Sequence, residues 1–150
     1  VSHLLAIGAS TGGPAAIAAI LAGWQPAPTT AVVIVQHIDA HFAQQFAKWL
    51  GVQLSVEARV IADGDVLVPG AIQVARTNDH LVIGPDGRLR YTADPRDYAY
   101  RPSVDVFFRC VARNAVYGMP RAAAELGAAQ LILPLDAIAA SLRSKIGTKP

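Results

Sequence analysis

The chain has 150 residues, of which 53% are hydrophobic and 16% charged, and its formal net charge is +2. This composition is typical of one globular domain with a well-buried core, and it excludes a disordered chain. The small net charge, without a dense run of Arg or Lys, gives no reason to propose a nucleic acid partner. No apolar stretch approaches the roughly 18 residues of a membrane span, so we expect no membrane insertion.

A single cysteine, Cys110, excludes a disulfide framework and a cysteine-rich metal site. It favours a reducing compartment, and we expect a cytoplasmic protein. No basic segment followed by an apolar run opens the chain, so nothing in it indicates secretion. Because Val1 stands almost on the first expected strand, we expect the chain to be part of a longer protein.

The start of the chain predicts a strand, a sharp glycine turn and a helix. Residues 4–7 are apolar, the turn is Gly8-Ala9-Ser10-Thr11-Gly12-Gly13, and a helix follows over about residues 14–23. The turn fits G-x-S-x-G, which exposes a serine hydroxyl at the carboxyl end of a parallel strand. The unpaired N–H groups and positive dipole of the helix start suit an oxyanion or a bound phosphate, so both interpretations stay open.

The following segments predict a doubly wound, mostly parallel α/β sheet with helices on both faces. The β-branched residues 31–35 predict a strand buried on both faces, which makes residues 4–35 a βαβ unit. A helix is expected over 40–50, with four apolar residues on one face, namely Phe42, Phe46, Trp49 and Leu50. Two short strands around a Pro-Gly turn (66–74) and a hairpin (81–91) then predict an antiparallel excursion.

The last third of the chain predicts a loop, three helices and one more strand. A polar, aromatic loop covers residues 93–101, and a helix follows through Arg113 with Ser103 as its N-cap. Pro120 suits the first turn of another helix, and residues 131–133 predict a last strand. We expect Asp136 to cap a closing helix that runs to Ile146 and ends at Gly147.

His37 ends the second expected strand. If the first two strands are neighbours, about 4.8 Å apart, Ser10 and His37 emerge at the same carboxyl edge within reach of a hydrogen bond. The alternative is a glycine turn needed only for packing, with a strand-end histidine that caps a backbone group. His3 falls on the opposite edge, while His41 and His80 are expected to be solvated or structural.

A dinucleotide site is the less favoured hypothesis for the same turn. Gly8 and Gly13 occupy the first and third glycine positions of G-x-G-x-x-G, but Ser10 stands at the second, where a backbone must approach pyrophosphate closely. The second strand also ends in Gln36-His37 rather than in the acid that binds the ribose. We therefore expect no cofactor.

Five blocks of the chain, taken together and in order, resemble the catalytic domain of the bacterial chemotaxis protein-glutamate methylesterases. They are Ile7 to Gly13, Val35-Gln36-His37, Ala62-Asp63-Gly64, Arg101 to Val106, and Tyr117 to Arg121. The resemblance implies a serine hydrolase with Ser10 as nucleophile and His37 as base, no metal, and in many members an upstream receiver domain. It implies as substrates glutamate methyl esters, and also glutamines, in the cytoplasmic helical region of methyl-accepting chemotaxis receptors.

Thr11 is the residue after the nucleophile at a helix N-terminus, so its backbone N–H is the best candidate for the oxyanion donor. Tyr98, Tyr100 and Arg101 are candidates to line the approach of the receptor helix. Four acids are better explained as turn, cap or surface residues, namely Asp39, Asp63, Asp65 and Asp105.

The chain lacks one family segment, of the type Leu-Thr-Gly-Met-Gly-x-Asp-Gly, which supplies the triad aspartate. Here Asn114 passes directly to Ala115, so a strand-turn-helix unit is missing and the third triad acid is unknown. We expect the natural protein to contain extra residues at this junction, because losing a strand should leave the core unfilled and a sheet edge exposed. The alternative is a catalytically inactive binding or regulatory module of the same fold.

Overall fold

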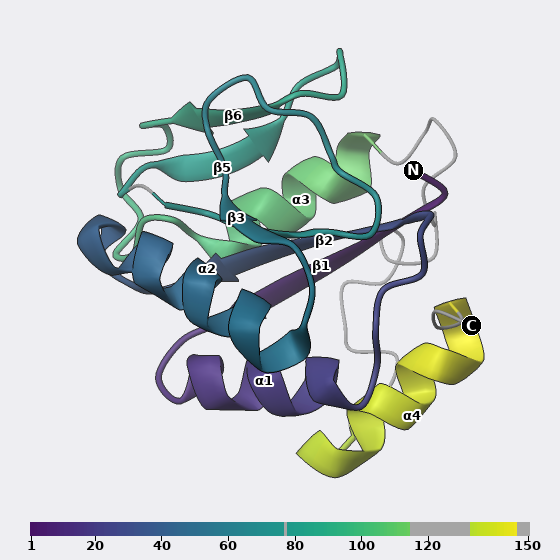
Figure 1. The fold of residues 1–150 in the computed structure, drawn as a ribbon. Coiled ribbons are helices and arrows are strands. Elements are labelled where there is room, and N and C mark those ends of the chain that lie inside the picture. The colour runs from purple at the N-terminus through teal and green to yellow at the C-terminus, as the bar shows by residue number, and fades with distance from the viewer. Residues whose placement is uncertain (77, 115–132, 147–150) are drawn as a thin grey trace.

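The computed structural model describes residues 1–76, 78–114 and 133–146 (Figure 1). Within them the chain forms six strands and four helices in the order β1 (His3–Ala9), α1 (Gly13–Ala22), β2 (Thr30–Gln36), α2 (Ala40–Leu54), β3 (Ala58–Val60), β4 (Ile72–Val74), β5 (His80–Ile83), β6 (Leu89–Thr92), α3 (Val104–Asn114) and α4 (Leu135–Ile146). None of the helices in these ranges is both long and apolar enough to cross a lipid bilayer.

Four strands form a parallel sheet in the order β1-β2-β4-β3, and β5 pairs with β6 in a separate antiparallel sheet. All seven residues of β2 are buried, as expected for a continuous apolar run at the centre of a parallel sheet. The predicted α/β class, the βαβ unit at the start and the antiparallel excursion are confirmed.

The parallel sheet lies between two layers, and each of its faces has its own core. Helices α1 and α2 cover one face, whereas α3 and the β5–β6 pair cover the other (Figure 1). Alternate residues of β2 belong to the two cores: Val32 and Ile34 pack with α1 and α2, and Val33 and Val35 pack with Leu81 and Phe107. This alternation decides on which face each side chain after the strand emerges.

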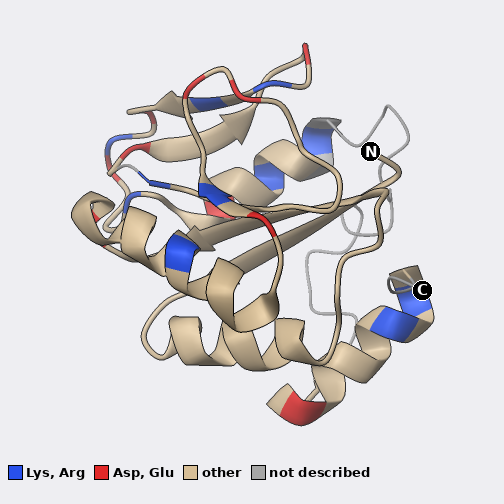
Figure 2. Cartoon of the chain, in the orientation of Figure 1, with Lys and Arg blue, Asp and Glu red and all other residues tan. Residues whose placement is uncertain are grey.

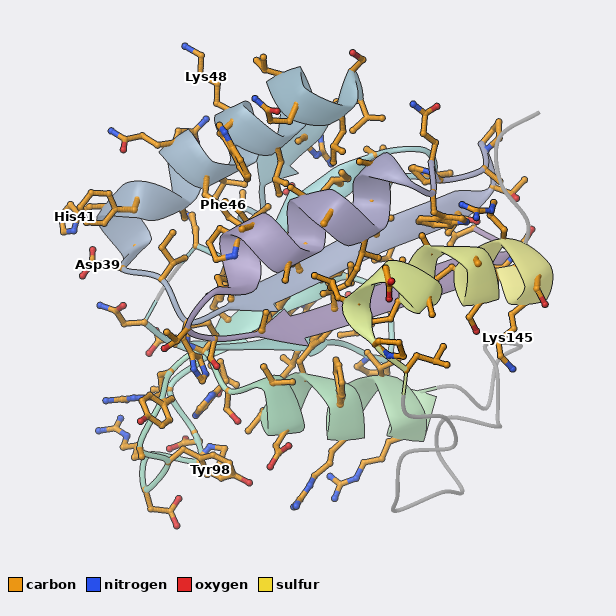
Figure 3. All side chains as sticks on the ribbon, turned by 90° about the horizontal axis from the view of Figure 1, so that it is seen from below. Asp39, His41, Phe46, Lys48, Tyr98 and Lys145 are labelled. Carbon is orange, nitrogen blue, oxygen red and sulfur yellow. The ribbon has the colours of Figure 1, made fainter. Side chains whose placement is uncertain are left out.

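The expected apolar face of α2 is wrong at two of its four residues. Phe46 and Leu50 are buried, and Figure 3 shows Phe46 between α2 and α1. Phe42 and Trp49, by contrast, are 55% and 40% exposed. The buried stripe runs instead through Ala43, Phe46, Ala47, Leu50 and Leu54. The helix also continues four residues beyond the expected Leu50.

The segment over residues 66–74 contains one strand rather than two. Only Ile72–Val74 forms a strand, while Val66 makes a single bridge to Arg88. The turn between them is present, with Gly70 at a φ of 77° that favours glycine. Strand β3 was not predicted, since a three-residue strand leaves no periodic pattern to detect.

Helix α3 packs against the core on its own face of the sheet. Phe107 is fully buried against β5, and Val104, Cys110 and Val111 pack around the same core. The helix therefore has a core to pack against within the described residues. The expected N-cap is confirmed, because the backbone N–H of Val106 donates to the Ser103 hydroxyl at 3.4 Å.

Several expectations for the C-terminal third lie outside the described residues. These are the Asn114–Ala115 junction, the helix after Pro120, the helix end at Gly147 and most of the strand over 131–133. Leu133, which is described, belongs to no strand. Helix α4 forms as expected, but Asp136 lies inside its first turn rather than at its cap.

The three histidines away from the candidate site behave as expected. His3 begins β1, at the end opposite to Ser10. The His41 side chain is 92% exposed and pairs with Asp39 at 2.7 Å; both are labelled at the start of α2 in Figure 3. His80 is fully buried and structural.

His80 ties the loop over 93–101 to the start of α3. The backbone N–H of Ser103 donates to Nδ1 of His80 at 3.1 Å, so the ring proton must lie on Nε2. Nε2 in turn donates to the carbonyl oxygen of Pro95 at 2.8 Å. Both ring nitrogens thus satisfy backbone groups, and the loop is held at both of its ends.

Replacing His80→Leu should lower the free energy of unfolding by about 1–3 kcal/mol, because it leaves a buried backbone donor and acceptor without partners. Urea unfolding followed by circular dichroism measures the change. The control is His41→Leu, which alters an exposed side chain and should leave the midpoint unchanged. Equal midpoints for the two variants would show that His80 does not hold the loop.

Candidate functional site

The site begins at the turn that joins β1 to α1. The backbone N–H of Gly13 donates to the carbonyl oxygen of Ser10 at 2.8 Å and closes the turn. Gly12, the N-cap of α1, has a φ of 78°, a left-handed conformation that glycine adopts without strain. Ser10, Thr11 and Gly12 are all exposed, so the serine hydroxyl lies at the surface where the strand ends.

The pairing of β1 with β2 places His37 beside this turn. Ala9 is the register partner of Gln36, and the backbone N–H of His37 donates to the carbonyl oxygen of Ala9 at 3.2 Å. Ser10 and His37 therefore each follow a paired position at the carboxyl edge of the sheet. The condition set for Ser10 and His37 to share this edge, that the first two strands are neighbours, is met.

Both side chains continue the same face of the sheet. Leu4 and Ala6 of β1 and Val33 and Val35 of β2 belong to the core beneath α3, and every second residue along a strand shares a face. The next position on this face of β1 is Gly8, which lies against Val104 of α3. Two residues after Gly8 and after Val35, the same alternation places Ser10 and His37 on the α3 side. Within the described part of the chain, no hydrogen bond joins the Ser10 hydroxyl to the His37 ring, and the buried Nε2 of His37 has no hydrogen-bond partner.

Tyr100 covers His37. The two rings stack with centroids 4.7 Å apart and planes inclined by 20°. The other face of Tyr100 is open, since the residue is 65% exposed. Of the other two loop residues named from the sequence, Tyr98 packs edge-on against His80 and Arg101 is exposed.

Gln36 lies beneath the serine turn and was missed as a site residue. It is 2% exposed, and its Nε2 donates to the carbonyl oxygen of Ser10 at 2.7 Å. The signal available in the sequence was a polar amide at the end of a wholly apolar strand, one residue before the candidate base. The backbone group that the Gln36 amide contacts depends on the register of β1 against β2, which the sequence does not show.

The start of α1 offers free hydrogen-bond donors at the surface. The backbone N–H groups of Thr11 and Gly12 take part in no hydrogen bond among the described residues. They stand at the positive end of the helix dipole, next to the Ser10 hydroxyl. This arrangement can stabilise negative charge that develops on an oxygen bound beside Ser10.

Two glycines let other groups come close to the turn. A Cβ on Gly8 would lie 2.2 Å from Cγ1 of Val104, so glycine is what allows the start of α3 to reach β1. A Cβ on Gly13 would lie 2.0 Å from Oε1 of Gln36. The glycines of the motif thus admit a helix on one face and an amide on the other.

The four acids named from the sequence are engaged away from His37 or exposed. Asp39 caps α2, accepting from the backbone N–H of His41 at 2.9 Å, and that hydrogen bond lowers the pKa of the carboxyl. Asp63 accepts from the N–H of Tyr91, and Asp65 from the N–H of Ala62, each at 2.9 Å. Asp105 lies exposed in the first turn of α3. The described residues thus place no acid on the His37 ring.

The same turn offers little to a dinucleotide or a metal. Ser10 occupies the position where pyrophosphate needs a glycine, and the acid nearest the end of β2, Asp39, is engaged as a helix cap. Across the described ranges, no three His, Cys, Asp or Glu side chains are grouped so that they could hold a metal ion. Within the described residues, Lys and Arg occur on several separate helices, strands and loops (Figure 2).

Comparison with known structures supports the architecture. The crystal structure of the Thermotoga maritima CheB methylesterase catalytic domain is similar with a TM-score of 0.77, covering 97% of this chain and 100% of that one. Its sequence identity is 21%, so this match shows a shared fold.

The sequence alignments with the relatives have more positions than this chain has residues to fill them. A protein-glutamate methylesterase/protein-glutamine glutaminase 2 of Cupriavidus metallidurans aligns over 179 positions, against about 140 residues for 93% of this 150-residue chain. A protein of the same name from Burkholderia lata aligns over 186 positions, against about 147 residues for 98% of this chain. In both cases about 39 aligned positions, the difference between the two figures, have no counterpart here.

The sequence comparisons are consistent with one another. The Cupriavidus protein is 43% identical and the Burkholderia protein 40% identical, and the alignments cover 53% and 55% of those proteins. The chain thus spans about half the length of the curated relatives that it matches. A family profile described as CheB methylesterase matches residues 5–115, which is most of the chain. The chain therefore belongs to the CheB methylesterase family.

Proposed function

We propose that the protein hydrolyses methyl esters of glutamate side chains in methyl-accepting chemotaxis receptors, and that it also deamidates receptor glutamines. One observation carries the proposal: Ser10 and His37 follow paired positions of two neighbouring parallel strands, beside the free N–H groups of Thr11 and Gly12. The names of the relatives, protein-glutamate methylesterase/protein-glutamine glutaminase, support both reactions. A cytoplasmic location and contact with the receptor's helical region belong to the same proposal.

In the proposed mechanism, Ser10 Oγ attacks the ester carbonyl carbon while His37 takes the hydroxyl proton. The carbonyl oxygen becomes an oxyanion, which the Thr11 N–H stabilises. As the bond from the carbonyl carbon to the leaving group breaks, His37 returns the proton to the methoxide oxygen, which leaves as methanol, or to the amide nitrogen of a glutamine, which leaves as ammonia. Water, deprotonated by His37, hydrolyses the acyl-serine and regenerates the hydroxyl.

The geometry of the two side chains is compatible with this role. No described residue forms a hydrogen bond with the buried Nε2 of His37, so none competes with Ser10 for it, and the Ser10 side chain is exposed and can change rotamer. Catalytic hydrogen bonds are commonly long before substrate binds and shorten in the complex. The stacked ring of Tyr100 limits the tilt of the imidazole.

The acid that orients His37 belongs, in this proposal, to a segment inserted between Asn114 and Ala115. About 39 aligned positions of the relatives without a counterpart in this chain support it. The edge of β1 supports it too, because β1 pairs only with β2 among the described strands. Without the segment the protein is a binding or regulatory module of the same fold, since an unoriented imidazole in a serine protease costs about 10⁴ in turnover.

Ser10→Ala should abolish methanol release from methylated receptor with little change in thermal unfolding, because it removes one hydroxyl from an exposed turn. A fluorophosphonate probe should label Ser10 in the wild type, as peptide mass mapping would show. Ser2→Ala, at the opposite end of β1, is the control and should keep full activity. Methanol release by the Ser10 variant at the wild-type rate would exclude this serine as the nucleophile.

His37→Ala should slow fluorophosphonate labelling of Ser10 by about 10²-fold or more, because a positioned general base contributes that much. The second-order labelling rate constant is the measurement. His41→Ala removes an exposed imidazole four residues further on and should label at the wild-type rate. Equal rates for the His37 variant and the wild type would remove His37 from the mechanism.

The intact mass of the natural protein should exceed the 15.8 kDa of this chain, and peptides should map between Asn114 and Ala115 with an aspartate among them. Mass spectrometry of the protein purified from its source makes the test. A tryptic peptide in which Ala115 directly follows Asn114 would contradict the insertion. It would favour the inactive module.

A further inference from the structure

Gln36 is a buried amide whose position neither packing nor sheet pairing explains. It ends β2, whose residues 31–35 are all apolar, and it is 2% exposed. Burying an amide is unfavourable unless its polar atoms find partners. Among the described residues, its Nε2 donates to the carbonyl oxygen of Ser10 at 2.7 Å, while its buried Oε1 accepts no hydrogen bond.

The space for this amide exists because residue 13 is glycine. A Cβ on Gly13 would lie 2.0 Å from Oε1 and 2.8 Å from Cδ of Gln36. The side chain therefore passes directly beneath the first turn of α1 to reach the Ser10 carbonyl. The same carbonyl accepts a second hydrogen bond from the Gly13 N–H at 2.8 Å.

Holding the Ser10 carbonyl also fixes the Thr11 N–H. The carbonyl of Ser10 and the N–H of Thr11 belong to one planar trans peptide group, in which they point in opposite directions. Two donors on the carbonyl side keep that plane from rotating, and they also polarise the peptide so that its N–H becomes a better donor. The free Thr11 N–H is thereby aimed away from Gln36, out of the protein.

We propose that Gln36 is a positioning residue that aims the Thr11 N–H at the oxyanion of the reaction. The proposal rests on the function proposed above for Ser10. Gln36 does not touch the substrate, and it acts through the Ser10–Thr11 peptide group. A buried acceptor without a partner is a cost to the fold, which an apolar side chain of the same length would avoid. The amide is therefore explained by its hydrogen bond to the Ser10 carbonyl, which orients the Ser10–Thr11 peptide group.

Two isosteric substitutions separate this role from a structural one. Gln36→Met keeps the length of the side chain, removes the donor to Ser10 and also removes the unpartnered oxygen. Gln73→Met is the matched control, since Gln73 is also fully buried on a neighbouring strand and holds backbone groups through its amide. The Gln73 amide is satisfied on both sides, by the N–H of Val68 at 2.8 Å and the carbonyl of Val66 at 3.0 Å.

The expected results are opposite for the two variants. Gln36→Met should lower the rate constant for fluorophosphonate labelling of Ser10 by about ten- to a hundredfold, and kcat for a small p-nitrophenyl ester by the same factor. This decrease should not exceed the decrease in kcat that follows removal of an oxyanion donor itself. Its KM and melting temperature should stay near those of the wild type, because the ground state does not use the oxyanion site. Gln73→Met should lower the melting temperature and leave both rates unchanged.

A third variant, Gln36→Glu, adds a pH signature. A protonated carboxyl can donate to the Ser10 carbonyl, whereas an ionised one can only accept and repels it. The ratio of the variant's labelling rate to that of the wild type should therefore rise as the pH falls from about 8 to about 5. A side chain that merely fills space would give a ratio independent of pH.

The outcomes distinguish this inference from the function on which it rests. Absence of labelling at Ser10 in the wild type overturns both. Labelling of the wild type and of Gln36→Met at equal rates, or a loss of rate in Gln36→Met that follows a loss of stability, overturns the role of Gln36 and leaves Ser10 as the nucleophile.

Discussion

The parallel register of β1 against β2 determines how every group at the candidate site is placed. Ala9 lies opposite Gln36, so the residues that follow, Ser10 and His37, leave the sheet side by side. A shift of one residue would move each side chain to the other face. In the observed register Gln36 continues the face of Ile34 toward α1, whereas His37 continues the face of Val35 toward α3. Consecutive residues thus lie beside the same turn on opposite faces of the sheet. Gln36 donates to the backbone carbonyl of Ser10, whereas His37 leaves the sheet on the face toward α3.

This arrangement depends on close approach on both faces. Val104 at the start of α3 presses on Gly8 from one side, and the Gln36 amide lies against Gly13 on the other. The left-handed Gly12, in contrast, has open space around it and is required for its backbone conformation alone. The glycines of one short motif are therefore required for three different reasons: room for α3, room for the Gln36 amide and a left-handed backbone conformation. Replacing each of them with Ala would disturb a different part of the site.

The sequence allowed the prediction of those parts of the structure that local patterns encode. Apolar runs identified β1 and β2, turn chemistry identified the β5–β6 hairpin, and a serine before Val104 identified the cap of α3. Contacts between segments distant in the sequence could not be predicted from local patterns. The stacking of Tyr100 on His37 and the hydrogen bond from Gln36 to Ser10 depend on loop path and strand register, which no local pattern encodes. The exposure of Phe42 and Trp49 likewise depends on which side of α2 meets the sheet.

The difference between β1 and β2 bears on what surrounds the site. Both strands have apolar centres, yet β2 is buried throughout, whereas every residue of β1 is partly or fully exposed. In the described part of the sheet β2 has a strand on each side and β1 on one only. Unpaired backbone groups along an apolar edge strand invite pairing with a further strand. A strand added there would bury Leu5 and Ile7 further and would end at the same edge as Ser10. An acid that follows such a strand would therefore approach His37 from the β1 side of the site.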